Sequence, residues 1–379
     1  MSFLEYRVKF APTGLRKILY MNWPLVLLVT AVASVGFLML YSIAGGNLDI
    51  WARPQMERFG VGMVLMFFVA MVPIWFWRSM SGVAYVVAFL LLLVVEFFGV
   101  VGMGAQRWID LGFIRLQPSE MMKFTLVMLL AVYYDWLDPK LVSRPLYVFL
   151  PLLMILTPTV LVLMQPNLGT SLMLILAGGT VMFAAGVSLW YFGAVIAIGV
   201  SAVVGVFTLR GTPWQFLHDY QYKRIDTFLD PAADPLGAGY NIIQAKIALG
   251  SGGWSGKGFM QGTQSRLNFL PEKHTDFIFT TLAEEFGFIG AFSLLGLYAL
   301  ILGFCLVAAW QNRDRFSALL IIGVAANFFF YIAVNLSMVM GMAPVVGVPL
   351  PLLSYGGSAM MVLLVGFGLV QSAHVHRPR

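Results

Sequence analysis

Long apolar runs separated by short polar segments recur along the whole chain. A helix rises about 1.5 Å per residue, so about 20 apolar residues cross a hydrocarbon core about 30 Å thick. The pattern therefore predicts an all-α, polytopic integral membrane protein with ten spanning helices. The predicted spans are Trp23–Ala44, Phe59–Trp77, Gly82–Met103, Ser119–Trp136, Pro145–Met164, Leu168–Val187, Trp190–Leu209, Thr281–Trp310, Phe316–Met340 and Ser354–Ala373.

One connection differs from the others in length and polarity. Residues 210–280, between the seventh and eighth predicted helices, form a polar segment far longer than an ordinary helix connection of about 2–8 residues. Such long loops are usually functional, so we predict a large loop within a single membrane domain that covers residues 1–379. Inside the loop, the apolar spacing over Tyr240–Leu249 predicts a short amphipathic helix at the surface.

The distribution of arginine and lysine predicts the orientation in the membrane. Ten spans place both termini on one side, and short cytoplasmic segments carry an excess of positive residues. One side holds eleven basic residues and the other holds four, so we predict cytoplasmic termini and an extracytoplasmic 210–280 loop. The eleven are Arg7, Lys9, Arg16, Lys17, Arg78, Lys140, Arg144, Arg313, Arg315, Arg377 and Arg379, and the four are Arg53, Arg58, Arg107 and Arg115.

Composition excludes several functional classes. Hydrophobic residues make up 60% of the chain and charged residues 11%, against about 25% charged residues in an ordinary soluble domain. The single cysteine, Cys305, lies within an apolar run, which excludes disulfides and cysteine-based metal centres. Basic residues in a membrane protein mark its cytoplasmic side, so the net charge of +6 does not indicate a nucleic-acid partner.

The densest group of polar side chains lies where the long loop returns to the membrane, in Leu270–Phe279. Partial burial raises the pKa of a carboxyl group and a nearby cation lowers it, and this balance suits a general base. We therefore predict Asp276 as the catalytic base, with Lys273, His274 and Thr275 as substrate contacts. The alternative is structural, with Thr275 or Asp276 capping the eighth helix.

A second polar group lies at the start of the fourth helix, on the same predicted side. Glu120 and Lys123 are three residues apart and share a helix face. Arg107 and Arg115 precede them, and with Lys123 they would form a cationic cluster suited to phosphate groups. We therefore predict that Arg107, Glu120 and Lys123 bind substrate. The alternatives are a local Glu120–Lys123 ion pair and arginines that anchor the chain beside Trp108.

The glycine-rich segment Gly250–Gly258 resembles a nucleotide-binding phosphate loop only superficially. Ser251 stands where that pattern requires glycine, and Lys257 is followed by glycine where the pattern requires Ser or Thr. We predict no nucleotide site there. A flexible glycine turn with backbone N–H groups open to a headgroup is left as an open interpretation of the segment.

The last two predicted helices are joined by Pro344–Ser358, whose prolines and glycines exclude a regular helix. Irregular backbone at membrane depth must be buried in protein or line a cavity, so we place this linker beside the active cavity. A rigid outer turn is the alternative. On the ninth helix, Asn327 and Asn335 are eight residues apart, share one face and are expected to hydrogen-bond to neighbouring helices.

Four separated motifs resemble the signature of the SEDS family of bacterial cell-wall polymerases, in order along nearly the whole chain. They are Gly104-Ala-Gln-Arg-Trp108 with Gln117-Pro-Ser-Glu-Met-Met-Lys123, then Gln165-Pro-Asn-Leu-Gly169, then Leu267-Asn-Phe-Leu-Pro-Glu-Lys-His-Thr-Asp276 with Glu284-Glu285-Phe-Gly287, and Pro349-Leu-Pro-Leu-Leu-Ser-Tyr-Gly-Gly357. Within the family, Asp234–Tyr240 and Gly250–Gly258 look more like the elongation member RodA than the division member FtsW.

The resemblance implies a peptidoglycan glycosyltransferase that polymerises lipid II into glycan strands during cell-wall elongation and rod-shape maintenance. It implies an inverting transfer with Asp276 as general base and Arg107, Glu120 and Lys123 nearby. The implied setting is the bacterial inner (plasma) membrane, with the active site facing outside. The implied partners are lipid II, membrane lipids, a class B penicillin-binding protein and other elongation-complex proteins. A divalent cation, Mg or Mn, is a candidate cofactor without assigned ligands, and no nucleotide is expected.

Two other functions are open alternatives. Ten spans with polar residues near broken backbone also suit a lipid II flippase or transporter. A carrier would place charged residues across the full membrane depth, whereas the polar groups here gather on one side, which favours an enzyme. A scaffold that only recruits a transpeptidase would tolerate replacement of Asp276.

Overall fold

The computed structural model describes residues 14–102, 105–110, 112, 115–212, 215, 219–231, 238–267, 270 and 272–377. Some residues used above lie outside these ranges. They are Arg7, Lys9 and Arg379 of the charge count, Gly104 of the first motif, residues 234–237, and residues 268, 269 and 271 of the third motif.

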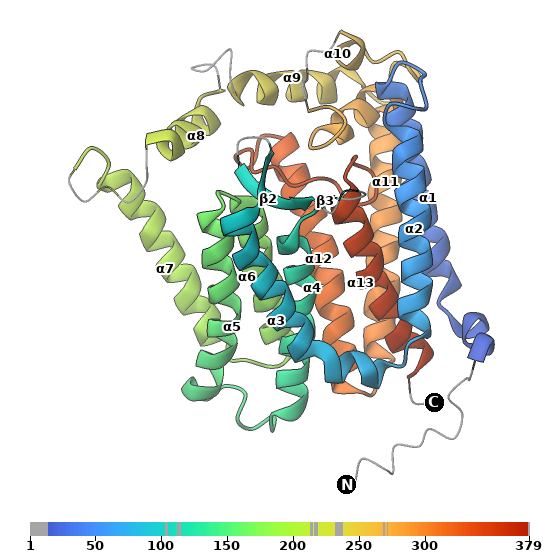
Figure 1. The fold of residues 1–379 in the computed structure, drawn as a ribbon. Helices are drawn as coiled ribbons and strands as arrows, with labels where there is room; N and C mark the ends of the chain where they lie inside the picture. Colours follow the sequence, from blue (N-terminus) through green and yellow to red (C-terminus); the bar gives the residue numbers. More distant parts are fainter. Residues whose placement is uncertain are drawn as a thin grey trace.

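Ten long helices form a bundle in the part of the chain that the structure describes (Figure 1). The predicted all-α architecture is therefore confirmed, although several boundaries differ. A short 3-10 helix, η1 (Gly14–Tyr20), precedes the bundle. The ten helices are α1 (Trp23–Ile43), α2 (Ala52–Met71), α3 (Ile74–Phe98), α4 (Pro118–Trp136), α5 (Pro145–Met164), α6 (Leu168–Ala184), α7 (Leu189–Thr208), α11 (Ile278–Trp310), α12 (Arg315–Val339) and α13 (Gly357–Val375).

Length and composition support a multi-pass membrane protein. Among the described residues, seven helices (α1, α3, α5, α7, α11, α12 and α13) are long and apolar enough to cross a membrane. The helix α6 is apolar but shorter. The helices α2 and α4 carry charged residues near their first turns, such as Arg53 in α2 and Glu120 in α4, and are less apolar for that reason.

The second and third helices were placed too late in the chain by hydropathy alone. Helix α2 begins at Ala52 rather than Phe59, because its polar first turns are helical although they are not apolar. It ends at Met71, and α3 begins at Ile74, directly after Pro73. Proline cannot donate a backbone hydrogen bond, so it suits the start of a helix and not its interior. The predicted span Phe59–Trp77 runs across the break between α2 and α3, so its bounds were wrong.

The third helix also ends earlier than predicted, at Phe98 rather than Met103. Extended backbone at Gly99 leads into three short strands, β1 (Val100–Gly102), β2 (Ala105–Asp110) and β3 (Arg115–Leu116). The strands pair antiparallel in the order β1-β2-β3. No strand was predicted here, because the segment is short and its pairing depends on residues that are separated along the chain.

The long loop folds over one end of the bundle (Figure 1). It contains α8 (Asp219–Leu229), α9 (Ala238–Ser251) and α10 (Thr263–Arg266). Helix α9 includes the predicted amphipathic segment and buries Ile242, Ala245 and Ala248. The helix η1 and the C-terminal end of α13 lie at the opposite end of the bundle (Figure 1).

A break in α11 explains the glycine-rich segment. Gly287 has φ 66° and ψ −162°, which interrupts the helix. The loop before α10 pairs with the broken turn, since Lys257 N–H donates to Glu284 O (3.0 Å) and Gly258 N–H to Glu285 O (3.0 Å). The N–H groups of Lys257 and Gly258 therefore bond within the protein. They are not open to a headgroup, so that interpretation of the turn is wrong for these two groups.

Glycine is required at this contact for steric reasons. A Cβ on Gly287 would lie 2.3 Å from the Gly256 nitrogen, and a Cβ on Gly256 would lie 2.1 Å from the Glu285 carbonyl oxygen. Distances this short are not possible between non-bonded heavy atoms. The segment is thus a clasp on α11, and its Gly252 and Gly256 allow the close backbone packing against α11.

The α12–α13 loop (residues 340–356) folds back into the bundle. Leu350, Leu352 and Leu353 are buried, and the Tyr298 hydroxyl of α11 donates to the Pro351 carbonyl at 2.7 Å. Gly36 of α1 packs so closely on Leu352 that a Cβ there would lie 2.8 Å from its carbonyl oxygen. The loop is therefore irregular backbone enclosed by protein, as predicted from its composition.

Candidate active site

Asp276 lies in a tight turn, residues 272–277, immediately before α11. Helix α11 begins at Ile278, and its N-cap residue Phe277 makes no side-chain capping bond. The Thr275 hydroxyl donates instead to Glu272 Oε2 at 2.9 Å, within the turn. Neither Thr275 nor Asp276 caps the helix, so the structural alternative for this motif is wrong.

Three successive carbonyl groups fasten the 272–277 turn to its surroundings. Tyr355 N–H donates to His274 O (2.9 Å), and the Ser354 hydroxyl donates to Thr275 O (2.6 Å). The Asn335 amide of α12 donates to Asp276 O at 2.8 Å. Two of the three donors belong to the α12–α13 loop. Its predicted place beside the candidate base is therefore confirmed.

The side chain of Asp276 is largely enclosed. It lies beside Gly347, where a Cβ would stand 3.6 Å from Asp276 Oδ2. Burial, with the nearby negative charge of Glu272, raises the pKa of Asp276 to about 6. A carboxylate with a pKa of about 6 is ionised near neutral pH and is more basic than an exposed aspartate. These are the properties that a general base requires.

His274 points into an aromatic cluster. Its ring stacks on Trp51, the N-cap residue of α2, with centroids 4.1 Å apart and planes 18° apart, and Tyr355 meets Trp51 edge-on. Burial lowers the pKa of His274, and the neighbouring charge of Lys273 acts in the same direction, while Glu272 opposes them. His274 is therefore stacked on Trp51, and its burial favours the neutral form of the imidazole.

Two cations lie close to this cluster. The pKa of Lys273 is lowered by burial, because desolvation disfavours the ammonium form. Arg58 of α2 places its guanidinium 4.9 Å from the centre of the Tyr355 ring. Arg58 was counted in the sequence only as a charge on the outer side. Its contact with Tyr355 depends on the packing of α2 against α13.

Glu120 and Lys123 form an ion pair that is buried rather than open. Their side chains are 6% and 1% exposed, and Lys123 Nζ lies 2.8 Å from Glu120 Oε1. The Tyr331 hydroxyl of α12 accepts from Lys123 and donates to Glu120 Oε2. The predicted local ion pair is present, and it is extended into a three-residue group. That these residues bind substrate stays a prediction.

Arg107 and Arg115 are engaged at other places. Arg107 donates to the carbonyls of Gln165 (3.0 Å) and Pro166, where α5 ends. Arg115 pairs with Asp110 within the small sheet, at 3.4 Å. Arg107, Arg115 and Lys123 thus each have their own partners in the protein.

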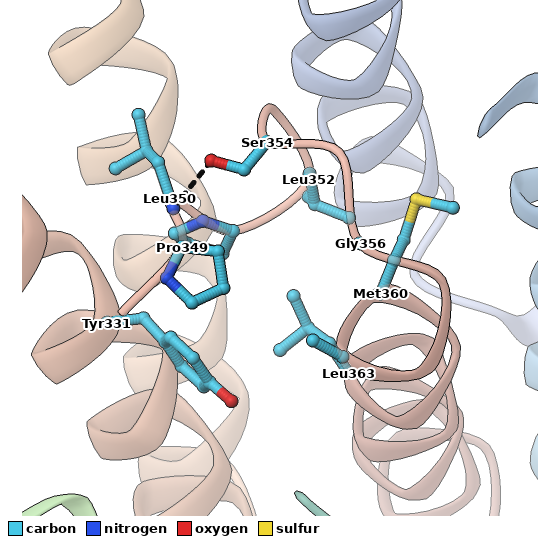
Figure 2. A pocket seen from close by; sticks show the side chains of 10 residues that line it. Tyr331, Pro349, Leu350, Leu352, Ser354, Gly356, Met360 and Leu363 are labelled. Carbon is cyan, nitrogen blue, oxygen red and sulfur yellow. Dashed lines mark hydrogen bonds between the residues drawn. The ribbon is translucent and has the colours of Figure 1, made fainter. Parts of the chain in front are cut away.

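A small, mostly apolar cavity lies among α12, α13 and the loop that joins them (Figure 2). Tyr331 lines it from α12, Pro349 and Ser354 from the α12–α13 loop, and Met360 and Leu363 from α13. Figure 2 shows the Ser354 hydroxyl accepting from the Leu350 N–H, at 2.8 Å. The cavity therefore lies between Tyr331, which bonds to Glu120 and Lys123, and the α12–α13 loop, which holds the 272–277 turn.

Comparison with known proteins decides the family. A family sequence profile described as "Cell cycle protein", covering FtsW, RodA and SpoVE, matches residues 19–379. The chain belongs to the FtsW/RodA/SpoVE family. Peptidoglycan glycosyltransferase MrdB of Escherichia coli strain K12 is 42% identical over 356 residues, 93% of each chain. Stage V sporulation protein E of Bacillus subtilis strain 168 is 34% identical and covers 91% of this chain and 94% of that protein.

Solved structures of this family share the fold. A chain of a peptidoglycan synthase complex that coordinates polymerization and crosslinking matches with a TM-score of 0.81 and 31% identity, covering 94% of this chain and 98% of that chain. The rod shape determining protein RodA of Thermus thermophilus matches with a TM-score of 0.70 and 29% identity, covering 95% and 98%. The predicted resemblance to the SEDS family and to RodA is confirmed.

The sequence did not predict the contacts that two residues, Tyr331 and Asn335, make in the candidate site. Tyr331 binds both members of the charged pair, and Asn335, expected only to bond between helices, holds the backbone of Asp276. The sequence carried one signal for Tyr331 and Asn335. They are four residues apart, which places both on one face of α12. Nothing in that spacing indicates which partners they meet.

The described residues contain no group of three or more His, Cys, Asp or Glu side chains arranged to hold a metal ion. Glu272 and Asp276 are close enough to raise the pKa of Asp276, but Glu272 already accepts from Thr275. Among the residues that the structure describes, the protein side chains alone therefore form no three-ligand metal site.

Proposed function

We propose that this chain is a peptidoglycan glycosyltransferase that polymerises lipid II during cell-wall elongation and rod-shape maintenance, with Asp276 as its general base. One observation carries the chemical part of the proposal. The carboxylate of Asp276 is enclosed and its pKa is raised to about 6, on a turn whose carbonyls are held from two elements. The glycosyltransferase activity of relatives such as MrdB supports the substrate class.

The reaction needs one base and a good leaving group. The 4-hydroxyl of the acceptor sugar attacks the anomeric carbon of the donor, and its proton passes to Asp276. A new carbon–oxygen bond forms as the bond to the undecaprenyl diphosphate breaks, and the diphosphate leaves with the electron pair. Direct displacement inverts the anomeric centre and requires no enzyme nucleophile, unlike retaining hydrolysis with two carboxylates.

The departing diphosphate requires positive charge more than a proton. Arg107 and Lys123 keep this role as proposals, although both have protein partners in the structure. A Mg or Mn ion would be bound chiefly by the diphosphate, because magnesium is commonly held by one or two carboxylates and substrate phosphates. Lys273, His274 and Thr275 are proposed to contact the sugar or its peptide.

The proposed orientation places the site outside the cell and both termini in the cytoplasm of a bacterial inner membrane. It is supported by the eleven-to-four charge bias and by the distance between the site and the helix η1, which lies at the opposite end of the bundle (Figure 1). A class B penicillin-binding protein is proposed as partner. The likeness to a synthase complex that coordinates polymerization and crosslinking supports it.

The test is polymerisation of purified lipid II by the detergent-solubilised chain, alone and with its partner, and with and without a chelator. Asp276→Asn keeps the volume and removes the basicity, so we expect product formation to fall by about 10²-fold or more while thermal stability is retained. Full activity in Asp276→Asn would refute the assignment of the base.

The transporter alternative is not favoured. Several relatives in this family are named peptidoglycan glycosyltransferases, including MrdB of Helicobacter pylori at 33% identity. The charged groups near the 272–277 turn also lie toward one end of the bundle, as an enzyme that works at one membrane face requires.

A further inference from the structure

Asn335 makes an unusual pair of contacts for a residue inside an apolar helix. It is 0% exposed, and its amide nitrogen donates to the carbonyls of both Asp276 (2.8 Å) and Val348 (2.7 Å). Two carbonyl acceptors fix the orientation of the amide, because the opposite orientation would place three oxygens together. One side chain of α12 therefore joins the 272–277 turn to the α12–α13 loop.

We propose that Asn335 is a positioning residue, which holds the backbone of Asp276 so that its carboxylate stays in the geometry that glycosyl transfer needs. The proposal rests on the proposed function of Asp276. Asn335 does not touch the substrate in this scheme and acts through Asp276. The turn's other bonds, from Ser354 and Tyr355, hold the two preceding residues, so the Asn335 bond is the one that fixes Asp276 itself.

The anchor of Asn335 is itself rigid. Tyr331 lies one turn earlier on the same face of α12, and its hydroxyl bonds to both Lys123 and Glu120 of α4. A buried, hydrogen-bonded ion pair is confined to one arrangement, because separating the charges in an apolar interior is costly. Helix α12 is thus held against α4 at Tyr331 and holds the base at Asn335. This gives Glu120 and Lys123 an indirect role in placing Asp276.

The chain contains a matched control. Asn327 is also 0% exposed on α12, eight residues earlier on the same face, and its amide atoms have no hydrogen-bond partner among the described residues. Asn327→Leu and Asn335→Leu therefore make the same chemical change in the same helix. They differ in the loss of the two bonds to Asp276 and Val348.

The first measurement is kcat and KM for lipid II polymerisation as a function of pH. Asn335→Leu is expected to lower kcat by about 10- to 100-fold, the scale of a 1 Å misplacement, with KM changed less. A loosened turn admits water and lowers the pKa of Asp276, so the acid limb of kcat moves to lower pH. Asn327→Leu is expected to leave both the rate and the limb in place.

The acid limb is informative because few charged groups surround the turn. Glu272, Lys273 and His274 belong to it, Arg58 approaches from α2 through Tyr355, and α12 contributes the neutral Asn335 and Tyr331. The variants alter none of the charged ones. A purely structural loss would reduce the active fraction without moving the limb.

A second variant guards against failure to fold. Asn335→Ala leaves a polar space beside two carbonyls. A water molecule can enter this space and partly replace the lost donor. We expect activity in the order wild type, Ala, Leu. Stability is expected to follow the opposite order for the two variants, because Leu fills the space and Ala does not. Activity that followed stability would overturn the proposal, as would wild-type activity in Asn335→Leu or equal losses in both Leu variants.

Hydrogen–deuterium exchange separates this inference from the proposed function. The amides of Thr275 and Phe277 bond to Glu272 O within the turn, each at 3.2 Å. Asn335→Leu should speed exchange in a peptide covering this turn, and Asn327→Leu should not. A wild-type chain without polymerase activity would refute the proposed function alone, and unchanged exchange in Asn335→Leu would refute the positioning role alone.

Discussion

At the scale of single residues, the proposed chemistry depends on how the carboxylate of Asp276 is enclosed. Asp276 is basic because burial and Glu272 disfavour its negative charge, while its ionised form is still the major one at neutral pH. The same carboxylate on an exposed loop would have an ordinary pKa and would be a weak base. Enclosure therefore supplies the reactivity that the residue type alone does not.

Replacing Glu272 by Gln should move the pH dependence of the reaction. Glu272 raises the pKa of Asp276 through its negative charge, so Glu272→Gln lowers that pKa toward its ordinary value. A base works in its ionised form, and the acid limb of kcat, expected near pH 6 in the wild type, therefore moves to lower pH. The measurement is a pH–rate profile. Glu57→Gln, an exposed acid of α2, is the control and should leave the limb unchanged.

Two variants of the Glu120–Lys123 pair test both its contribution to stability and its predicted contact with substrate. Lys123→Met leaves Glu120 buried without its cation, which is expected to cost about 3–5 kcal/mol of unfolding free energy. Adding Glu120→Gln removes the stranded charge and should restore much of the thermal stability in detergent. The KM of that double variant then checks the sequence-based prediction. A raised KM supports contact with substrate, and an unchanged KM contradicts it.

At the scale of elements, two irregular segments build the site on a regular bundle. The break at Gly287 lets the glycine-rich loop clasp α11, and buried Glu284 accepts from Lys257 (2.7 Å) and from the Thr263 N–H (2.9 Å) across the same contact. The α12–α13 loop enters the bundle from the other side. The 272–277 turn lies at the start of α11 and is fastened to the second segment.

Gly287→Ala should damage the clasp on α11. The new Cβ would overlap the Gly256 nitrogen, and the φ of 66° is strained for alanine. We expect a loss of about 1–3 kcal/mol or more and a lower midpoint of thermal unfolding. Gly296→Ala, on the same helix with open space around it, is the control. It should be neutral or slightly stabilising, because alanine is the better helix former.

At the scale of the whole molecule, the polar segments gather at one end of the helix bundle. The long loop, the small sheet and the 272–277 turn lie at one end of the bundle, and η1 lies at the other (Figure 1). An undecaprenyl-linked donor has its sugar and diphosphate at the membrane surface. A site at one end of the bundle can therefore reach the reacting atoms while the lipid stays in the bilayer.

The orientation can be checked by labelling single cysteines in intact cells. In a Cys305→Ala background, Ser255→Cys places a thiol at an exposed position in the glycine-rich loop, and Arg313→Cys places one between α11 and α12. An impermeant maleimide should label position 255 in intact cells and position 313 only after lysis. Labelling of position 313 in intact cells would reverse the proposed topology.

The sequence by itself determined the all-α membrane class and the ten long helices, and it pointed to Asp276 as the candidate base. Apolar length and charge bias are local properties, readable along the chain because the bilayer imposes one length and one asymmetry on every span. Asp276 was identifiable because charge is rare in such a chain, and its motif resembled a known family. Hydropathy failed where polar residues continue a helix, as at Ala52, and where short strands replace one, as after Phe98.

The tertiary structure alone decided which groups meet. Tyr331 reaches Lys123 across 208 residues of sequence, and Asn335 reaches Asp276 across 59. Such contacts depend on how the helices pack around the α12–α13 loop, and no local pattern specifies that packing. For the same reason, the sequence did not indicate the separate protein partners of Arg107, Arg115 and Lys123, which were predicted to form a cationic cluster. Composition shows which charges are present, while the packing of helices determines which groups they meet.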